Sequence, residues 1–278
     1  MDYWEIKVLY LGKINSGVAG TWPSSMPPLT APFPLASPYL GFLLKKGDRR
    51  IVVDTGISEK FIVDGKAWGG FPAEGGRAYL ERALKKEGVT PEEIETVIYT
   101  HLHNDHAAHC SLFRRARIIF QKDEWLNLLN PIPLQILRKD YDPDLIPELK
   151  SMNPLVVDGD MEVEDGIQLY KTPGHTLGSQ SVAVRTSRGV VVLIGDLCGR
   201  YHYLFPQLGE IVDMEGKRHE VPKAPLALGQ AVASNLIYDS FAFYDSIAKV
   251  KALAARNEPG YILPGHEPSL VWRGLGES

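Results

Sequence analysis

The chain has 278 residues, of which 44% are hydrophobic and 23% charged, which is the composition of an ordinary globular protein with a substantial core. Its net charge of −4 at pH 7 argues against a nucleic-acid partner, which would require a basic surface. No apolar stretch approaches the roughly 20 residues of a membrane span, and the N-terminus lacks the basic and apolar regions of a signal peptide. We therefore expect a soluble, cytoplasmic protein whose two cysteines are too few for a disulfide framework.

The N-terminal third predicts strands, one long loop and a helix. Residues 4–12 (WEIKVLYLG) read as a strand, whereas residues 13–38 are rich in Pro, Ser and Gly and predict an irregular loop that lies against the body of the protein. Residues 39–56 contain two apolar runs around a Gly-Asp turn, which predicts a β-hairpin. In residues 76–88, apolar side chains recur at helical spacing and Gly88 ends the helix.

The middle of the chain alternates strands with helical segments. Strands are predicted at residues 94–100 (IETVIYT) and 117–121 (RIIFQ). Residues 122–130 (KDEWLNLLN) predict a helix that Pro131 stops. Residues 131–154 predict helical pieces broken by further prolines.

The C-terminal part predicts three strands, an insertion, a helix and a last strand. Residues 161–172 (MEVEDGIQLYKT) predict one strand, and residues 180–196 predict two more that the turn SRG joins. Residues 199–235 show little periodicity and are interpreted as an irregular insertion. Residues 240–257 predict a long amphipathic helix, and residues 260–264 (GYILP) predict the last strand.

One pattern occurs in both halves of the chain: a buried strand ending in Asp, a helix, and a strand ending in His. The first half has IVVDTG (51–56) and VIYTHLH (97–103), and the second half has VVLIGD (191–196) and YILPGH (261–266). This is a weak internal duplication of a βα unit. Because ligands gather beyond strand ends, we expect the polar ends of the two halves to meet in one cleft.

The stretch HLHNDH directly follows a predicted strand. In an extended chain, His101 and His103 point to the same side. Asp105 continues that row if the chain stays extended. Alternatively, a helix begins with Asn104 or Asp105 as its cap, and the turn swings His106 towards a second centre.

Three further polar residues at strand ends, His175, Asp196 and His266, are each preceded by glycine, which suits the tight turns that aim such side chains. Imidazole and carboxylate ligands suit zinc, and also iron, manganese or cobalt. Two divalent ions bridged by a hydroxide would form an electrophilic site that stabilises an anionic intermediate. The predicted ligands of such a two-metal centre are His101, His103, Asp105, His106, His175, Asp196 and His266.

The remaining histidines and cysteines are expected not to be metal ligands. His109 is expected beside the ligands or at the surface, and His202 and His219 fall in the irregular insertion. Cys110 is expected to pack as a small hydrophobic residue. Cys198 is also expected in the core, although its position in the sequence leaves an approach to the site open.

The motifs HLHNDH, PGHT, GD and PGHE, in this order, resemble those of the metallo-β-lactamase-fold hydrolases, from about residue 40 to the C-terminus. The resemblance implies an α/β fold: a four-layer αβ/βα sandwich in which two mixed β-sheets are flanked by helices, with two metal ions in the cleft between the halves. It implies a single domain over residues 1–278, with irregular insertions at about 13–38, 131–154 and 199–235.

The resemblance also implies a role for each ligand. Asp54 of VVDTG would orient a ligand imidazole. His101, His103 and His175 would hold one metal ion; Asp105, His106 and His266 would hold the other; and Asp196 would bridge the two.

The front half is most similar to the N-acyl homoserine lactonase branch, whose members act in quorum quenching. The shared features are a Pro-rich N-terminal loop, IVVDTG, a segment with WGGF, and IYTHLHNDHA. Asp196 argues against a true β-lactamase, which generally has another residue at the bridging position. The branch carries a Tyr that contacts the substrate carbonyl where this chain has Gly199, so we expect Tyr201 or Tyr203 to replace it.

The resemblance predicts hydrolysis of a lactone by a hydroxide that bridges two metal ions, most simply Zn²⁺. Asp105 would steer the hydroxide and carry a proton to the leaving alkoxide. Residues 131–154 and 199–235 would form the wall for an apolar acyl part of this small-molecule substrate. Alternatives are a glyoxalase-II-like thioesterase and a mononuclear-iron persulfide dioxygenase, and a homodimer is left open.

Overall fold

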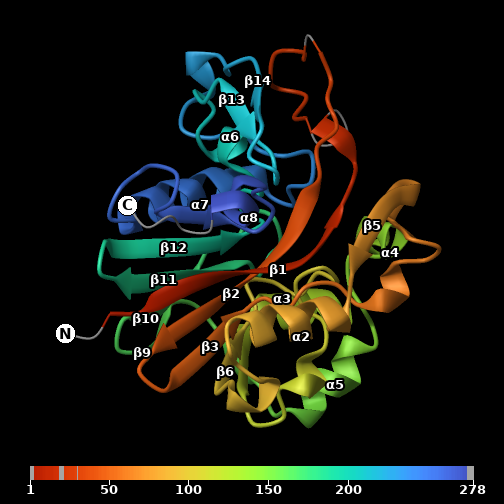
Figure 1. Cartoon of the computed structure of the whole chain (residues 1–278), viewed down its shortest axis with the longest axis vertical. Coiled ribbons are helices and arrows are strands. Elements are labelled where there is room, and N and C mark those ends of the chain that lie inside the picture. The colour runs from red at the N-terminus through yellow and green to blue at the C-terminus, as the bar shows by residue number, and fades with distance from the viewer. Residues whose placement is uncertain (1–2, 19–21, 30, 274–278) are drawn as a thin grey trace.

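The computed structural model describes residues 3–18, 22–29 and 31–273. Its largest sheet has the strand order β4-β5-β1-β2-β3-β6-β7-β8. Figure 1 shows β1, β2 and β3 side by side in this sheet. Strands β1, β2 and β3 pair antiparallel and β3, β6, β7 and β8 pair parallel, so the sheet is mixed. Its strands are β1 (Glu5–Ile14), β2 (Ser37–Lys46), β3 (Arg49–Val53), β4 (Lys66–Ala67), β5 (Phe71–Gly75), β6 (Thr96–Ile98), β7 (Arg117–Gln121) and β8 (Leu155–Val157).

The second sheet has five strands in the order β15-β12-β11-β10-β9. All its pairs are antiparallel except β12 with β15, so it is mixed as well. Its strands are β9 (Met161–Glu164), β10 (Ile167–Lys171), β11 (Gln180–Thr186), β12 (Gly189–Gly195) and β15 (Ile262–Pro264). A separate two-stranded ribbon consists of β13 (Glu210–Val212) and β14 (Arg218–Glu220).

The α-helices are α2 (Arg77–Lys86), α3 (Lys122–Leu129), α4 (Pro133–Arg138), α5 (Leu145–Ser151), α6 (Tyr201–Leu204), α7 (Ser240–Leu253) and α8 (Ser269–Arg273). Short 3-10 helices occur at η1 (Glu59–Phe61), η2 (Trp68–Gly70), η3 (Pro91–Glu93), η4 (Cys110–Leu112) and η5 (Leu226–Leu228). In the described part of the chain, no helix has both the length and the apolarity that crossing a membrane requires.

Alternating side chains of the strands divide the core into layers. In β2, Leu43 packs with the apolar side chains of α2, α3 and α5, whereas its neighbour Phe42 packs between the two sheets. In β12, Leu193 lies in that same space between the sheets, and Val192 packs on α7 from the other side. Because successive side chains of a strand point to opposite faces, both sheets are covered on both faces. The expected order of helices, sheet, sheet and helix is confirmed.

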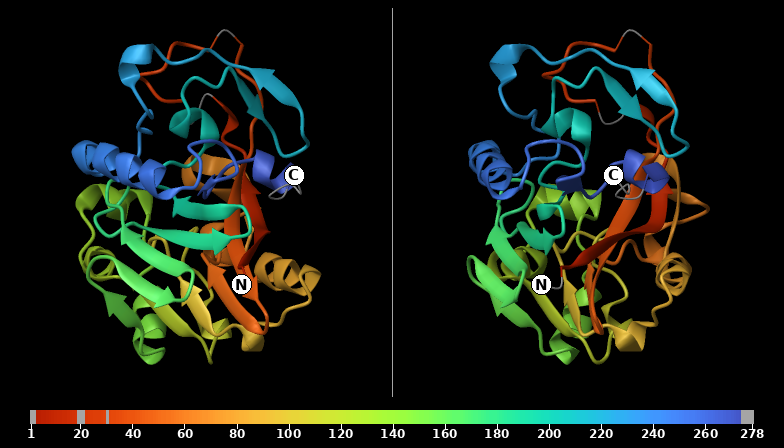
Figure 2. Two further views of the ribbon diagram at one scale, coloured as in Figure 1. Left: turned by 90° about the vertical axis from the view of Figure 1, so that its left-hand side faces the viewer. Right: turned by 60° about the vertical axis from the view of Figure 1, so that its left-hand side comes forward.

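The internal duplication predicted from the sequence is also confirmed. Strand β3 leads through α2 to β6, which pairs with it in parallel, and β12 leads through α7 to β15 in the same way. The loop at 13–38 lies against the insertion at 199–235, as Val18 and Leu35 pack on Ile211. Figure 2 shows this loop and the β13–β14 ribbon together at one end of the molecule.

Three local predictions were wrong. Residues 161–172 form two strands, because Gly166 adopts a left-handed φ of +86° in a tight Asp-Gly turn between β9 and β10. The chain turns after His103, as one alternative expected, but no α-helix begins there, and the side-chain amide of Asn104 donates to the carbonyl of Lys139 instead of capping a helix. Residues 199–235 are more regular than expected, since they contain α6 and the β13–β14 ribbon.

Candidate metal centre

The histidine-rich stretch after β6 forms a tight turn. The backbone N–H groups of His106 and Ala107 both donate to the carbonyl of His103, each at 3.0 Å. The turn brings the ring of His106 to 4.2 Å from the ring of His101, measured between centroids. Nε2 of His106 lies 3.4 Å from Nε2 of His266, so His106 faces the opposite half of the molecule, as the alternative with a turn at this point predicted.

The other predicted ligands reach the same place from the second sheet. His175 lies in the loop between β10 and β11, Asp196 follows β12, and His266 follows β15. Glycine allows the close approach: a Cβ on Gly265 would lie 2.9 Å from Oδ1 of Asp196. A Cβ on Gly195, whose φ is +50°, would lie 2.4 Å from Oγ1 of Thr100.

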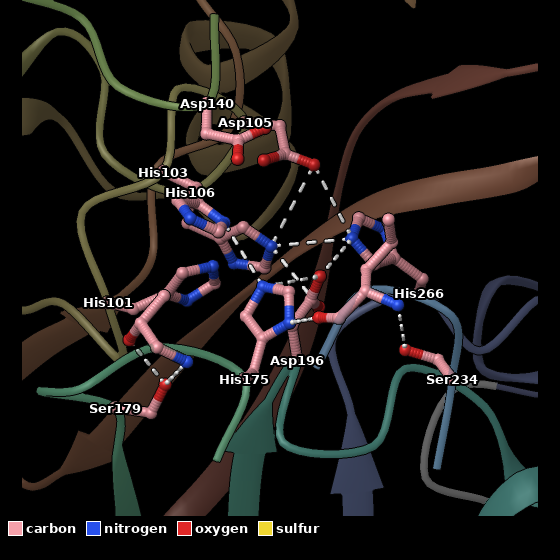
Figure 3. A network of polar contacts seen from close by, with 12 residues as sticks. His101, His103, Asp105, His106, Asp140, His175, Ser179, Asp196, Ser234 and His266 are labelled. Atoms are coloured by element: carbon pink, nitrogen blue, oxygen red, sulfur yellow. Dashed lines mark hydrogen bonds and ion pairs between the residues drawn. The ribbon is translucent and has the colours of Figure 1, made fainter. Parts of the chain in front are cut away.

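The seven predicted ligands form three overlapping groups, and within each group the ligand atoms lie within 4.8 Å of one another. Figure 3 shows their side chains pointing towards one another from both halves of the fold. In the part of the chain that the structure describes, these are the groups with the donors and spacing for a metal ion. The groups are His101, His103 and His175; His101, His106 and Asp196; and Asp105, His106 and His266.

Several of these ligand atoms face each other. Nε2 of His175 lies 3.1 Å from Nδ1 of His103, and Nε2 of His106 lies 3.4 Å from Nε2 of His266. Nε2 of His101 is buried without a hydrogen-bond partner among the described residues. Converging imidazole lone pairs and an unpartnered buried nitrogen fit a divalent cation, which imidazole and carboxylate ligands bind well.

Asp196 lies between two sets of histidines, one containing His175 and the other containing His106 and His266. Its Oδ2 is 3.0 Å from Nε2 of His266 and 3.7 Å from Nε2 of His175, and its Oδ1 is 3.3 Å from Nε2 of His106. Asp196 is thus the predicted ligand with carboxylate oxygens near histidines of both sets. This position suits a ligand that is shared between two ions.

Each of three ligand imidazoles is oriented through its other nitrogen. Nδ1 of His106 lies 2.9 Å from Oδ2 of Asp54, which also accepts a bond from Oγ1 of Thr100. Nδ1 of His266 donates to the carbonyl of Pro38 at 2.7 Å, and Nδ1 of His175 donates to the carbonyl of Leu236 at 2.9 Å. Such bonds fix the ring and leave Nε2 for a metal ion.

Burial and neighbouring charges shift the pKa values of the predicted ligands in different directions. Burial, and then the neighbouring imidazoles, hold the pKa of His101 well below its usual range, so its ring is neutral at pH 7. Burial alone would raise the pKa of Asp196, but His266 and His106 outweigh it and lower that pKa well below its usual range. Asp196 and Asp105 outweigh burial at His106 and raise the pKa of its imidazole well above its usual range. Because metal ions bind neutral imidazole and ionised carboxylate, binding at His106 would displace a proton.

Glu124 of α3 is a buried carboxylate that no pattern in the sequence singles out. It accepts hydrogen bonds from the backbone N–H of Leu102 (3.0 Å), from Oγ1 of Thr176 (2.6 Å) and from the hydroxyl of Tyr141 (2.8 Å). Leu102 lies between two predicted ligands, and Thr176 follows a third. Through these hydrogen bonds, Glu124 connects the loop that contains Leu102 to the loop that contains Thr176.

A cavity of about 1290 Å³ opens onto the ligands. His103, Asp105, His175, Asp196 and His266 line it, together with apolar side chains from η2 and α4. Residues 131–144 and 199–203 contribute to its wall, as was expected for the two insertions.

The structure does not support the prediction that Tyr201 contacts the substrate. Its side chain packs in the core between the sheets, and its hydroxyl accepts the N–H of Gly260 at 3.0 Å. Tyr203, two residues later, lines the cavity, as does Gly199. Two positions along a helix differ by about 200° in direction, so the two tyrosines of α6 face different ways.

We expect Tyr201→Phe to lower the free energy of unfolding by about 1 kcal/mol, because the N–H of Gly260 loses its acceptor. Bound metal and turnover should stay as in the unchanged protein. Urea unfolding and metal analysis test this prediction, and a loss of turnover without a loss of stability would contradict it.

Asp140 is a further acidic group in the cavity wall that sequence analysis missed. Burial raises its pKa to about 6; the charge of Asp105 adds to this rise, and Arg138 at 3.1 Å opposes it. Figure 3 shows Asp140 beside Asp105. The sequence carries no signal for this pairing, because the two residues come from separate loops.

The raised pKa of Asp140 predicts a pH-dependent stability of the metal-free protein. The carboxyl of Asp140 binds its proton more tightly in the folded than in the unfolded protein. Its contribution to the stability of the folded state is therefore full below the unfolded pKa of about 3.9 and is lost as the pH rises through about 6. Asp140→Asn should therefore be more stable than the unchanged protein at about pH 7.5, by roughly 1–3 kcal/mol, and this gain should shrink towards pH 5. Urea unfolding in a chelator tests it; a stability difference that does not change with pH would contradict it.

The remaining histidines and cysteines lie outside the three ligand groups. His109 lies next to the centre in sequence, but its Nε2 donates to the carbonyl of Ile57 at 3.2 Å. His219 pairs with Asp213 at 2.8 Å, and His202 stacks on Trp22. Cys110 and Cys198 are buried in separate apolar clusters, so the core position expected for both is confirmed.

Comparison with known proteins gives one family match and several relatives. The model of the Metallo-beta-lactamase superfamily matches residues 38–266. An N-acyl homoserine lactonase of Bacillus cereus is 32% identical over 164 residues, which cover 56% of this chain and 62% of the relative. The matched segment is thus less than two thirds of that relative's length.

Solved structures show the same fold. A Bacillus thuringiensis AiiA mutant, with N-decanoyl-L-homoserine bound at its active site, superposes with a TM-score of 0.69 at 24% identity, over 96% of this chain and 94% of that one. AidC, a dizinc quorum-quenching lactonase, superposes with a TM-score of 0.54 at 18% identity, over 80% and 70% of the two chains.

Proposed function

Because the chain belongs to the metallo-beta-lactamase superfamily, we propose that it is a dinuclear metal-dependent hydrolase that opens lactones. The observation that carries this proposal is the convergence of seven His and Asp side chains into three overlapping ligand groups. We also propose that residues 1–278 act as one catalytic domain.

One ion would be held by His101, His103 and His175, the other by Asp105, His106 and His266, with Asp196 shared. When bound, such ions lower the pKa of a coordinated water and polarise a carbonyl group. The donor set suits zinc, and also iron, manganese or cobalt. The dizinc centre named for AidC supports zinc as the first candidate.

The chain's own residues supply the proton transfer. Asp105 lines the cavity, and its Oδ2 lies 3.4 Å from Nε2 of His266. A carboxylate in this position can take a proton from the attacking water and deliver it to the leaving oxygen. Asp54 would keep the imidazole of His106 in position through the 2.9 Å contact to Nδ1.

The cavity supports an uncharged substrate with an apolar part. Leu128, Ile136 and Leu137 line the same cavity as the proposed ligands and would contact an acyl chain. Two cationic side chains that line the cavity form ion pairs with carboxylates: Lys60 with Asp142 and Asp144, and Arg138 with Asp140. The named relatives that act on acyl homoserine lactones support the same class of substrate, and with it a role in quorum quenching.

A glyoxalase-II-like thioesterase is the second candidate. Arg200 is buried and lines the cavity, and its guanidinium donates to Oγ of Ser37. A fixed guanidinium favours an anionic substrate.

The free thiols of Cys110 and Cys198 support a reducing compartment such as the cytoplasm. That two copies of this chain form a homodimer stays a prediction.

The zinc-loaded protein should be tested with N-acyl homoserine lactones, glutathione thioesters and β-lactams. We expect opening of the lactone ring, measured by proton release. Cleavage of the thioester alone would favour the second candidate. Turnover of the β-lactam alone, or oxygen uptake with a persulfide and bound iron, would overturn the proposal.

A further inference from the structure

Tyr39 of β2 lies next to the proposed metal centre but is not one of its predicted ligands. Its side chain is fully buried, and it lines the same cavity as Asp105 and His266. Its ring meets the ring of His266 edge to face, with centroids 6.0 Å apart and an angle of 71°. The preceding carbonyl, that of Pro38, accepts the bond from Nδ1 of His266. Tyr39 is therefore held against a predicted ligand by its ring and by its backbone.

The hydroxyl of Tyr39 has no hydrogen-bond partner among the residues that the structure describes. A buried hydroxyl without a partner is costly, so native proteins seldom keep one without a role. Two other buried tyrosines differ in this respect. Tyr141 donates to Glu124 at 2.8 Å, and Tyr201 accepts from Gly260 at 3.0 Å. Tyr39 is a buried tyrosine in the cavity wall whose hydroxyl bonds none of the described residues.

The position of Tyr39 indicates which oxygen its hydroxyl would meet. Asp105 and His266 form one ligand group with His106, and Tyr39 contacts the His266 side of that group. Asp105 is the carboxylate that would deliver a proton to the leaving oxygen. A neutral phenol in the same part of the cavity is a hydrogen-bond donor at neutral pH, because its ordinary pKa is about 10.

We propose that Tyr39 is a catalytic residue whose hydroxyl donates a hydrogen bond to the leaving oxygen of the lactone. This inference rests on the proposed function. When the bond between the acyl carbon and the ring oxygen breaks, the ring oxygen keeps the electron pair and takes the proton that Asp105 delivers. Tyr39 keeps its own proton throughout and stabilises the negative charge before that proton arrives.

Tyr39→Phe removes the hydroxyl and keeps the ring against His266. It should be compared on an N-acyl homoserine lactone and on the corresponding thiolactone. The thiolactone releases a thiolate, which carries its charge more easily and accepts hydrogen bonds weakly. We expect kcat to fall roughly 30-fold or more for the lactone and less than about threefold for the thiolactone.

Tyr201→Phe is the matched control, because its hydroxyl lies outside the cavity, and it should leave the ratio of the two rates unchanged. Tyr39→Phe should also keep the metal content and should not lower the unfolding temperature of the unchanged protein, since it loses no hydrogen bond within the described chain. An equal loss of kcat on both substrates, no loss on either, or a lower unfolding temperature would overturn the role of Tyr39. If the unchanged protein opens neither ring, the proposed function fails first, and this inference fails with it.

Discussion

His106→Ala is expected to remove one of two bound metal ions and to lower kcat/KM at least about 1000-fold. His106 belongs to two of the three ligand groups, and its Nε2 lies 3.3 Å from Asp196 and 3.4 Å from His266. A bound ion contributes several kcal/mol of transition-state stabilisation, and about 4 kcal/mol corresponds to roughly three orders of magnitude in rate. Metal quantification and lactone hydrolysis on the same preparation measure both effects.

His109→Ala is the matched control for this experiment. It removes an imidazole three residues away that bonds the carbonyl of Ile57 and belongs to none of the ligand groups. We expect it to keep both ions and to change kcat/KM by less than about threefold. A His106→Ala protein with both ions and undiminished turnover would contradict the assignment of His106.

Glu124→Gln is expected to have the second largest effect, on stability and on metal affinity together. The substitution replaces one of the two acceptor oxygens with an NH₂ group, which then faces either the donors of Leu102 and Tyr141 at Oε1 or the donor of Thr176 at Oε2. Because a buried donor without an acceptor costs about 1–3 kcal/mol, we expect the free energy of unfolding to fall by about 3 kcal/mol. Loosening the loops that carry the ligands should weaken metal binding roughly 10- to 100-fold.

Asp123→Asn controls for a change of charge on the same helix. Asp123 precedes Glu124 and pairs with Lys171 in a partly exposed position, where an ion pair contributes less than about 1 kcal/mol. Urea unfolding and competition with a metal indicator should separate the two variants clearly. Equal stability and equal metal affinity for both would show that Glu124 does not hold the ligand loops.

The convergence of the seven proposed metal ligands could be predicted from the sequence because each residue sits where a local pattern changes. Buried strands end at His101, Asp196 and His266, and glycine marks the turn before the last two. These signals are local, and the repeated order of strand, helix and strand indicated that they would meet. The choice between an extended chain and a turn after His103 could not be made, since it depends on the contact of Asn104 with the distant carbonyl of Lys139.

The residues that surround the ligands could not be predicted in the same way. Glu124 is one of two acidic residues at the start of α3, and sequence alone does not say which one the body of the protein buries. Tyr39 lies in an apolar strand, where sequence analysis would assign any aromatic residue to the hydrophobic core. Tyr201 and Tyr203 were equivalent in sequence, and the short helix α6 directs one into the core and the other into the cavity wall.

The most direct test of the whole account is the metal content of the purified protein. After saturation with zinc and removal of the excess, mass spectrometry of metals should find two ions per chain, and the His106→Ala protein should hold one. A protein that holds no ion under these conditions, or a single iron that both proteins bind equally, would contradict the two-metal centre.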